Sequence, residues 1–227
     1  MFSGMAFCAD CGSKLYHCRC GSYSYEQESY TCSKYRTRHG CSAHFIRAVV
    51  LEQLVWMHME AVISYVTRYE THFRAIMERR LKLSTDEAIK VRRKKLAKDE
   101  KRLEELDRLF VRLYEDNVAG RISDERFSMM SEGYETEQAT LKAEVQTLQQ
   151  EIEQQEQQLD DLDLFIQRVQ SYAELKELTP YALRELVKAI YIEAPDKSSG
   201  KRRQGIRIAY DLIGFIPVEE LAQQETA

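Results

Sequence analysis

Apolar residues recur with the period of a helix through most of the chain. From Ile46 they return at steps of three and four residues, which predicts a first helix ending near Leu83. Ser84-Thr85-Asp86-Glu87 has the order of a capping box, so a second helix is expected to begin there, or the first to bend. The inward positions predicted for the first helix are Ile46, Val49, Val50, Leu54, Met57, Ala61, Tyr65 and Ile76.

The second predicted helix repeats its apolar residues at intervals of seven. Leu106 and Leu113 join this series, but the matching positions nearer the start of the helix, Arg92 and Asp99, are polar, so tighter packing is expected toward its far end. Gly120 is a helix stop and Ser123 an N-cap, and so short a connection makes the next helix run back antiparallel. The apolar series is Ile89, Leu96, Leu103, Leu106, Phe110 and Leu113.

The returning helix alternates steps of four and three from Tyr134 to Val169, which predicts an antiparallel coiled coil. The outgoing helix is rich in Lys and Arg and the returning helix in Glu and Asp, so attraction between them is expected to fix the pairing. Near the connection, Val118, Ile122 and Phe127 are expected either to contact another copy of the arm or to pack inside the hairpin end.

All the cysteines lie between Phe7 and Phe45, where the helical period is absent. Cys8 and Cys11 form a C-x2-C pair before Gly12, and Cys32 and Cys41 add two further thiols. Four such thiolates can enclose a tetrahedral Zn²⁺. Leu15–Cys18 and Tyr30–Lys34 are the expected strands of this module. So small a module buries too little apolar surface to fold alone, and a bound ion would supply the missing free energy.

Disulfides are the rival interpretation, because the six cysteines are even in number. Zinc is favoured, since no hydrophobic signal segment precedes Cys8 and no cysteine follows Cys41, as suits a reducing cytosol. Nearby residues could replace Cys32 or Cys41 as ligands, although the histidines among them are expected to be solvated surface residues. These substitutes are Cys18, Cys20, His17, His39 and His44.

The C-terminal part changes to short elements. Thr179-Pro180 is expected to cap and open a short helix, and Ala189–Ala194 and Gly205–Leu212 to form a β-hairpin. The hairpin loop is basic. It is expected either to contact phosphates or to be merely a solvated loop. Its cations, with one from the second strand, are Lys201, Arg202, Arg203 and Arg207.

Composition bounds the class of protein. The 227 residues are 31% charged with a mean hydropathy of −0.51, which predicts a soluble chain of two or three parts. No apolar run reaches the roughly 18 residues that a membrane span needs. Although the net charge of the whole chain is −4, its N-terminal module is basic and has tyrosines among its cations. This suits DNA phosphates, or equally a solvated ribbon face, and its candidate DNA-binding cations are Lys14, Arg19, Lys34, Arg36 and Arg38.

Several segments together resemble a known family, the large serine recombinases. They are similar to the C-terminal half of those proteins, and within them to the resolvase-like proteins of bacterial transposons and integrative elements. The resemblance covers nearly all of residues 1–217. The segments are FSGMAFCADCGSKLY, YTCSKYR, CSAHFIRAVVLEQLV, RLYEDNVAGRISDERF, IYIEAPD and GIRIAYDLIGF.

The resemblance implies a zinc ribbon domain with an inserted antiparallel coiled coil. In that family the ribbon binds double-stranded DNA in and beside the attachment site. The coiled coil contacts the arm of another subunit, which controls synapsis and the direction of recombination. Carried over by position, the structural zinc ligands are Cys8, Cys11, Cys32 and Cys41, while Cys18 and Cys20 have no counterpart in the pattern.

The expected fold is mainly α. It combines a small zinc-bound β-ribbon domain, a long antiparallel coiled-coil arm, and a C-terminal β-hairpin that returns to the ribbon domain. The expected parts are a zinc ribbon at 1–47, a connecting helix at 48–83, the arm at 84–178 with its tip near 117–124, a short helix and basic hairpin at 179–217, and a disordered tail at 218–227.

The resemblance does not extend to the family's catalytic domain, whose serine forms a covalent link to DNA, or to its helical domain. The residues present offer no nucleophile–base pair, no carboxylate cluster for Mg²⁺ and no Gly-rich phosphate loop. The chain is therefore expected to be non-catalytic, as a fragment or the product of a truncated gene.

Two functions follow from these patterns. The first is the DNA-binding and subunit-interaction region of a site-specific serine recombinase in the bacterial cytoplasm, self-associating through its arm, with no membrane or small-molecule partner. The second is a zinc-anchored coiled-coil adaptor or scaffold that does not bind DNA.

Overall fold

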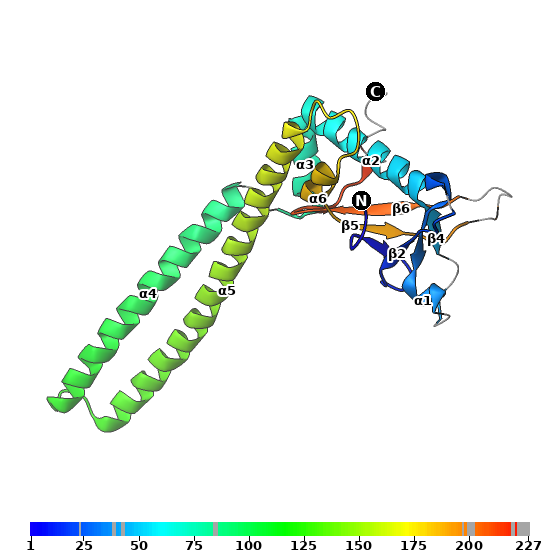
Figure 1. The fold of residues 1–227 in the computed structure, drawn as a ribbon. Helices are drawn as coiled ribbons and strands as arrows, with labels where there is room; N and C mark the ends of the chain where they lie inside the picture. The colour runs from blue at the N-terminus through cyan, green and yellow to red at the C-terminus, as the bar shows by residue number, and fades with distance from the viewer. Residues whose placement is uncertain are drawn as a thin grey trace. The chain divides into compact units, whose positions relative to one another are not determined.

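A computed structural model describes residues 1–227 apart from 23, 38–39, 42–43, 84–85, 197, 199–202, 219–220 and 222–227. The fold is mainly helical with small sheets (Figure 1). A cysteine cluster lies in its N-terminal part. It divides into two compact units. The first comprises Met1–Arg80 and Asp160–Ala227, and the second comprises Leu81–Leu159.

A four-stranded sheet in the first unit joins the two ends of the sequence. Its order is β1-β5-β6-β7, with β1 parallel to β5 and the other neighbours antiparallel. The sequence analysis anticipated β5 and β6 within two or three residues at each end but missed the short strands β1 and β7. The strands are β1 (Ala6–Cys8), β5 (Val187–Ile192), β6 (Ile206–Tyr210) and β7 (Gly214–Phe215).

A three-stranded antiparallel sheet completes the N-terminal part, with β2 (Leu15–Cys18), β3 (Ser29–Cys32) and β4 (Phe45–Arg47) in that order. Strand β2 agrees with its prediction. The predicted extension of β3 to Lys34 is wrong, because the short helix α1 (Ser33–Arg36) begins there. The helical period was predicted to begin at Ile46, but Ile46 lies in β4, whose residues alternate exposed, buried, exposed as a strand with one covered face does.

The first long helix is broken into α2 (Ala48–Arg68) and α3 (Glu70–Arg80), where Tyr69 leaves the helical backbone with φ −131° and ψ 45°. The gap between Tyr65 and Ile76 in the predicted apolar series coincides with this break. The predicted inward face of α2 is wrong at Val50 and Met57, which are 41% and 64% exposed, but Tyr65 is buried as predicted. The buried residues of α2 are Ala48, Leu51, Val55, Met59, Val62, Ile63, Tyr65 and Val66.

Helix α2 is apolar nearly all round, so its periodicity cannot tell which face is buried. By length and hydropathy it could cross a membrane, which the sequence analysis did not anticipate. A core helix of a soluble protein meets the same criterion, and Leu51, Val55 and Met59 of α2 are fully buried in the first unit. The hydropathy of α2 is therefore weak evidence for a membrane.

Aromatic packing holds the centre of the first unit together. Phe165, in the last part of α5 (Asp124–Ser171), is 1% exposed. Its ring stacks on Phe73 of α3 at 6.2 Å and meets Tyr210 of β6 edge-on at 5.6 Å. The Tyr210 hydroxyl is also 3.0 Å from Nδ1 of His58 on α2. Helices α3 and α5 and strand β6, which are distant in sequence, thus meet around the ring of Phe165.

Stability of the first unit should depend on pH through His58. Burial lowers the pKa of His58 below its usual 6.5, so the folded protein keeps this imidazole neutral. The unfolded chain takes up a proton first as the pH falls. The free energy of unfolding should therefore decrease from about pH 6.5 downward until the folded pKa is passed. Urea midpoints near neutral pH and at about pH 5 measure this change.

The variant His58→Gln removes the titrating group while retaining a polar side chain. It should show a smaller loss of stability between the two pH values than the unchanged protein. An equal loss in both proteins would mean that other groups carry the acid sensitivity.

Helix α6 (Pro180–Leu186) begins as its sequence predicts. Thr179 Oγ1 accepts a hydrogen bond from the Ala182 amide at 3.1 Å, and proline occupies the first turn. Ala182, Leu183 and Leu186 are buried. The expected tail at 218–227 lies almost entirely outside the described residues. Leu221 is one of its described residues, and it is buried, with 2% of its surface exposed.

The second unit consists of α4 (Asp86–Val118) and the larger part of α5. Ion pairs join the start of α4 to later residues of α5 and the middle of α4 to earlier ones, so the helices run antiparallel. Asp99 is 8% exposed, and its carboxylate lies 3.8 Å from Lys95. The pairs between the helices are Arg92–Glu151, Arg93–Glu156, Lys95–Glu144 and Arg102–Glu137.

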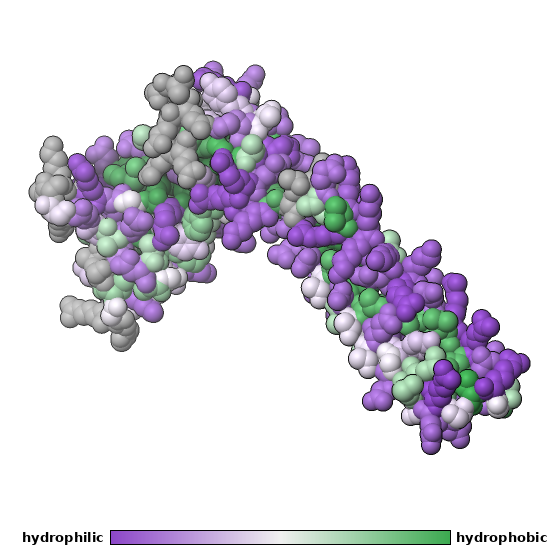
Figure 2. Space-filling model, turned by 180° about the vertical axis from the view of Figure 1, so that it is seen from behind, coloured by the Kyte–Doolittle hydropathy of each residue, from purple (hydrophilic) through white to green (hydrophobic). Residues whose placement is uncertain are grey.

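The connection between α4 and α5 uses the predicted residues. Gly120 has φ +69°, a left-handed conformation that suits glycine after a helix end. Ser123 Oγ accepts from the Arg126 amide at 3.4 Å, and the Asn117 side chain donates to Asp124 at 2.9 Å. The surface of this unit is mainly hydrophilic with apolar patches (Figure 2). Exposed apolar residues near the connection are Val111, Tyr114, Val118 and Met129.

Candidate metal centre

The first two cysteines are positioned by a tight turn after β1. The Gly12 amide donates to the Cys8 carbonyl at 2.9 Å, and the Cys8 amide donates to the Ser13 carbonyl at 2.8 Å. Gly12 has φ +67°, which residues with a side chain rarely adopt. The turn places Cys8 and Cys11 on the same side of the backbone, as expected from the C-x2-C spacing.

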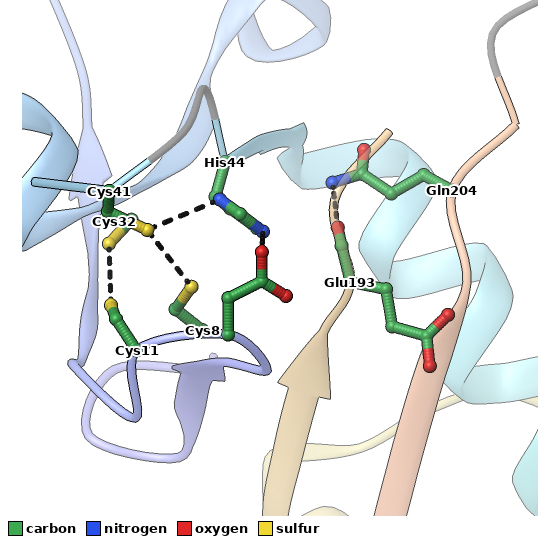
Figure 3. Close-up of polar contacts among 8 residues, drawn as sticks. Cys8, Cys11, Cys32, Cys41, His44, Glu193 and Gln204 are labelled. Atoms are coloured by element: carbon green, nitrogen blue, oxygen red, sulfur yellow. Dashed lines mark hydrogen bonds and ion pairs between the residues drawn. The ribbon is translucent and has the colours of Figure 1, made fainter. Parts of the chain in front are cut away.

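The other two cysteines approach from the second sheet. Cys32 ends β3, and its amide donates to the His44 carbonyl at 2.9 Å, which holds the segment after Cys41 beside it. The four Sγ atoms lie within 4.8 Å of one another (Figure 3). The Cys8–Cys41 separation is 3.7 Å and the Cys11–Cys32 separation 3.5 Å.

These separations fit zinc. A tetrahedron of sulfurs at ~2.3 Å from a central ion has edges of about 3.8 Å. A disulfide would need about 2.05 Å between sulfurs, and all six cysteines are free. Both the donor set and its size therefore suit a structural Zn²⁺, which would be held by Cys8, Cys11, Cys32 and Cys41 and would crosslink β1 to the second sheet.

The thiols of the cluster are not equivalent. Burial raises the pKa of Cys8, and burial together with the thiols of Cys11 and Cys8 raises that of Cys41. Burial also opposes ionisation of Cys11, but hydrogen bonds with Ser13, Cys32 and Cys8 together outweigh it and lower the pKa of that thiol. A divalent cation stabilises all four as thiolates, so metal binding would be accompanied by proton release.

His44 lies beside the cluster. It is 0% exposed, so the prediction of a solvated surface residue is wrong for His44. Its Nδ1 is 3.5 Å from the Cys41 sulfur, and its Nε2 is 3.2 Å from the carboxylate of Asp10 (Figure 3). In the sequence, only the nearness of His44 to Cys41 suggested that His44 could lie at the cluster. Nothing in the sequence suggested a role for Asp10, which lies inside the C-x2-C turn.

The remaining candidates for the cluster lie apart from it. The Cys18 sulfur is 3.6 Å from the Tyr16 carbonyl, and the exposed Cys20 sulfur is 3.4 Å from the Ser22 hydroxyl. His17 pairs with Glu28 at 3.0 Å. His39 lies outside the described residues.

The predicted DNA-binding cations differ in their surroundings. Lys14, Lys34 and Arg36 are exposed, as is Arg203. Two others are engaged in ion pairs, Arg19 with Glu28 at 3.1 Å and Arg207 with Glu193 at 3.4 Å. Arg38, Lys201 and Arg202 lie outside the described residues.

The three predicted tip residues belong to the second unit. Val118 is 69% exposed, whereas Ile122 and Phe127 are half-buried. The Phe127 ring lies 6.5 Å from that of Tyr114 in an edge-on arrangement. Phe127 therefore packs within the chain, and Val118 faces solvent.

Comparison with protein families gives two matches. Residues 1–60 match the recombinase zinc beta ribbon domain, and this range includes all four clustered cysteines. Residues 151–217 match a domain of unknown function (DUF4368). Comparisons with curated proteins and with solved structures found no match. The N-terminal part of this chain is therefore a zinc ribbon region related to that of the serine recombinases.

Proposed function

We propose that this chain is the DNA-binding and subunit-interaction region of a site-specific serine recombinase of a bacterial mobile element. The observation that carries the proposal is the sulfur cluster, which has the size of a zinc site and lies within the segment that matches the recombinase zinc beta ribbon domain. Recombinases act on DNA, so a ribbon of this kind is expected to contact double-stranded DNA in the cytoplasm.

The ribbon has cations available for that contact. Lys34 and Arg36 are exposed neighbours on α1, directly after the ligand Cys32, and Lys14 is exposed near the turn that holds Cys8 and Cys11. Phosphate contacts from such side chains position a protein on DNA without reading its sequence. We assign the primary contacts to these three residues, with Arg19 and Arg207 weakened by their carboxylate partners.

The second unit supports the subunit-interaction part of the proposal. Its antiparallel helices, joined by charged pairs, suit a coiled-coil arm comprising residues 84–178. Val118, with the other exposed apolar residues near the connection, would contact a second copy. The remaining parts would be the zinc ribbon at 1–47, the connecting helices at 48–83 and the short helix and hairpin at 179–217.

Strand cleavage is not part of the proposed activity. The two family matches are a zinc ribbon and a domain of unknown function, and neither describes a catalytic domain. In this proposal the region holds DNA and pairs subunits, while a serine nucleophile elsewhere in a complete recombinase performs the chemistry.

Salt dependence of duplex binding tests the DNA contact. The double variant Lys34→Gln/Arg36→Gln should reduce the slope of log affinity against log salt by about 1.8, because each phosphate contact contributes about 0.9. Fluorescence anisotropy with a labelled duplex over a salt series measures this slope. The control Lys94→Gln/Lys98→Gln makes the same charge change on α4 and should leave the slope unchanged.

Two results would contradict the assignment. An unchanged slope in Lys34→Gln/Arg36→Gln would remove these residues from the interface. A protein that retains no duplex even at low salt would favour the zinc-anchored adaptor that does not bind DNA.

A further inference from the structure

The four-stranded sheet carries a row of aromatic and basic residues across its strands. Phe7 of β1 pairs with Tyr191 of β5, and Tyr191 pairs with Arg207 of β6. An isolated bridge places Lys14 opposite Phe7 on the other side of β1. Directly paired residues project from the same face of a sheet. Lys14, Phe7, Tyr191 and Arg207 therefore form one row, here called the aromatic row.

This row lies on the face opposite the core. The alternate residues Ala6, Ile190, Ile192 and Ile208 are at most 2% exposed, and Tyr210 of the same set packs on Phe165. The aromatic row is more open. Lys14 and Arg207 are exposed at its ends, and Phe7 and Tyr191 are half-buried between them.

Phe215 of β7 extends the row into a continuous aromatic surface. The Tyr191 ring lies 5.9 Å from Phe7 on one side and 5.9 Å from Phe215 on the other. Phe215 is 42% exposed, and the guanidinium of Arg207 lies 5.9 Å from its ring centre. Ala189 and Ala209, a directly paired couple on this face, add no bulk that would interrupt it.

The chemistry of this face fits a nucleic-acid strand. Aromatic rings stack on unpaired bases of any sequence, and cations beside them bind the phosphates. A four-stranded sheet that presents aromatic residues is an established solution for single strands. Here Tyr191 lies on the central strand β5, and Phe7 and Phe215 lie on the edge strands β1 and β7. Lys14 lies beyond Phe7 at the end of the row, whereas the Arg207 guanidinium lies over the Phe215 ring. Arg207 must therefore turn from that ring to a phosphate before a base can stack on the same ring face.

An intact duplex fits this face poorly. Four strands about 4.8 Å apart span roughly 14 Å between the outer backbones before side chains are added, whereas the major groove is about 12 Å wide. The sheet face cannot enter the groove, and stacked bases inside a duplex offer no faces to the rings.

We propose that the aromatic row and Phe215 bind single-stranded nucleic acid, with bases on Phe7, Tyr191 and Phe215 and phosphates on Lys14 and Arg207. This site goes beyond the proposed function and uses a different surface from Lys34 and Arg36. Glu193 limits its strength, because its carboxylate is 3.4 Å from Arg207 and competes with phosphate for the same guanidinium.

Binding of a labelled oligo-dT and a labelled oligo-U to the full chain tests the proposal. The double variant Tyr191→Leu/Phe215→Leu keeps apolar bulk but removes two stacking rings. It should weaken binding of the tighter oligomer at least about thirtyfold, since two stacked bases are lost and each contributes about 1–3 kcal/mol. Tyr191→Phe retains the ring and should bind as the unchanged protein does. The tighter oligomer identifies DNA or RNA as the strand.

Glu193→Gln provides a test that misfolding cannot imitate. Release of Arg207 from its carboxylate should strengthen binding of the oligomer about threefold or more, as one additional phosphate contact would. Zinc content and circular dichroism establish that each variant is folded.

The proposal fails if neither oligomer binds, if Tyr191→Leu/Phe215→Leu binds as tightly as the unchanged protein, or if Glu193→Gln weakens binding. A duplex of the same length separates this site from the proposed function. Loss of duplex affinity in Lys34→Gln/Arg36→Gln with oligomer binding intact, and the reverse in Tyr191→Leu/Phe215→Leu, would show two independent surfaces.

Discussion

Chelation of zinc unfolds the ribbon and leaves the paired helices α4 and α5 formed. This is the largest effect that we expect. Structural zinc contributes about 10–16 kcal/mol of apparent binding free energy to small modules, more than a sheet of three short strands can replace. The four sulfurs converge from β1, its following turn, β3 and the segment before β4. Without the ion these segments lose their common anchor.

Hydrogen exchange measures the result by region. Amides of β2, β3 and β4 should lose protection after chelation, whereas those in the middle of α4 and α5 should keep it. Far-UV circular dichroism should retain most of its helical signal, because these two helices are the longest in the protein.

A pair of cysteine variants tests the same point without a chelator. Cys32→Ser removes a buried thiol of the cluster and should reproduce the loss of ribbon protection together with loss of bound zinc. Cys20→Ser is the matched control, because Cys20 is exposed and lies outside the cluster. A Cys32→Ser protein with full zinc content and a protected ribbon would refute the assignment of the site.

Truncation of Phe165 has the second largest expected effect. Phe165→Ala should lower the free energy of unfolding of the first unit by about 3–5 kcal/mol, the usual cost of removing a large aromatic side chain from a core. The ring is 1% exposed and contacts both Phe73 and Tyr210. Its loss would leave a cavity among α3, α5 and β6.

Leu164→Ala is the control for this prediction. Leu164 precedes Phe165 on the same helix but is 40% exposed, so its truncation should cost much less. Urea unfolding followed by tyrosine and tryptophan fluorescence compares the two variants. Equal losses would mean that the buried Phe165 ring contributes no more to the stability of this region than an exposed side chain of the same helix does.

Local signals in the sequence predicted where α4 ends and where α5 and α6 begin. Gly120, Ser123 and Thr179 act through contacts a few residues away, and the structure places each at the helix end that its residue type favours. The C-x2-C spacing likewise predicted that Cys8 and Cys11 belong to the cluster, because such a turn is local geometry. Cys32 and Cys41 had nearby alternatives, and their assignment came with the family resemblance.

Features that depend on distant partners were missed. Strand β1 is only three residues long and is defined by β5, which no nearby residue reveals. The buried face of α2 is set by what packs on it, because apolar residues occur on all its sides. His44 was placed in solvent, since neither periodicity nor composition shows that its carbonyl accepts from Cys32 and its ring meets Asp10.

The pairing of β1 with β5 has a consequence for synthesis of the protein on the ribosome. Residues 6–8 emerge early, yet their hydrogen-bonding partners at 190–192 emerge only after both long helices have been made. At roughly 5–20 residues per second, the first strand waits for about 10–40 seconds with one edge unpaired. The helical hairpin can form in that interval from contacts within itself. The two long helices of the nascent chain should therefore pair first, and the four-stranded sheet should close only after β5, β6 and β7 have emerged.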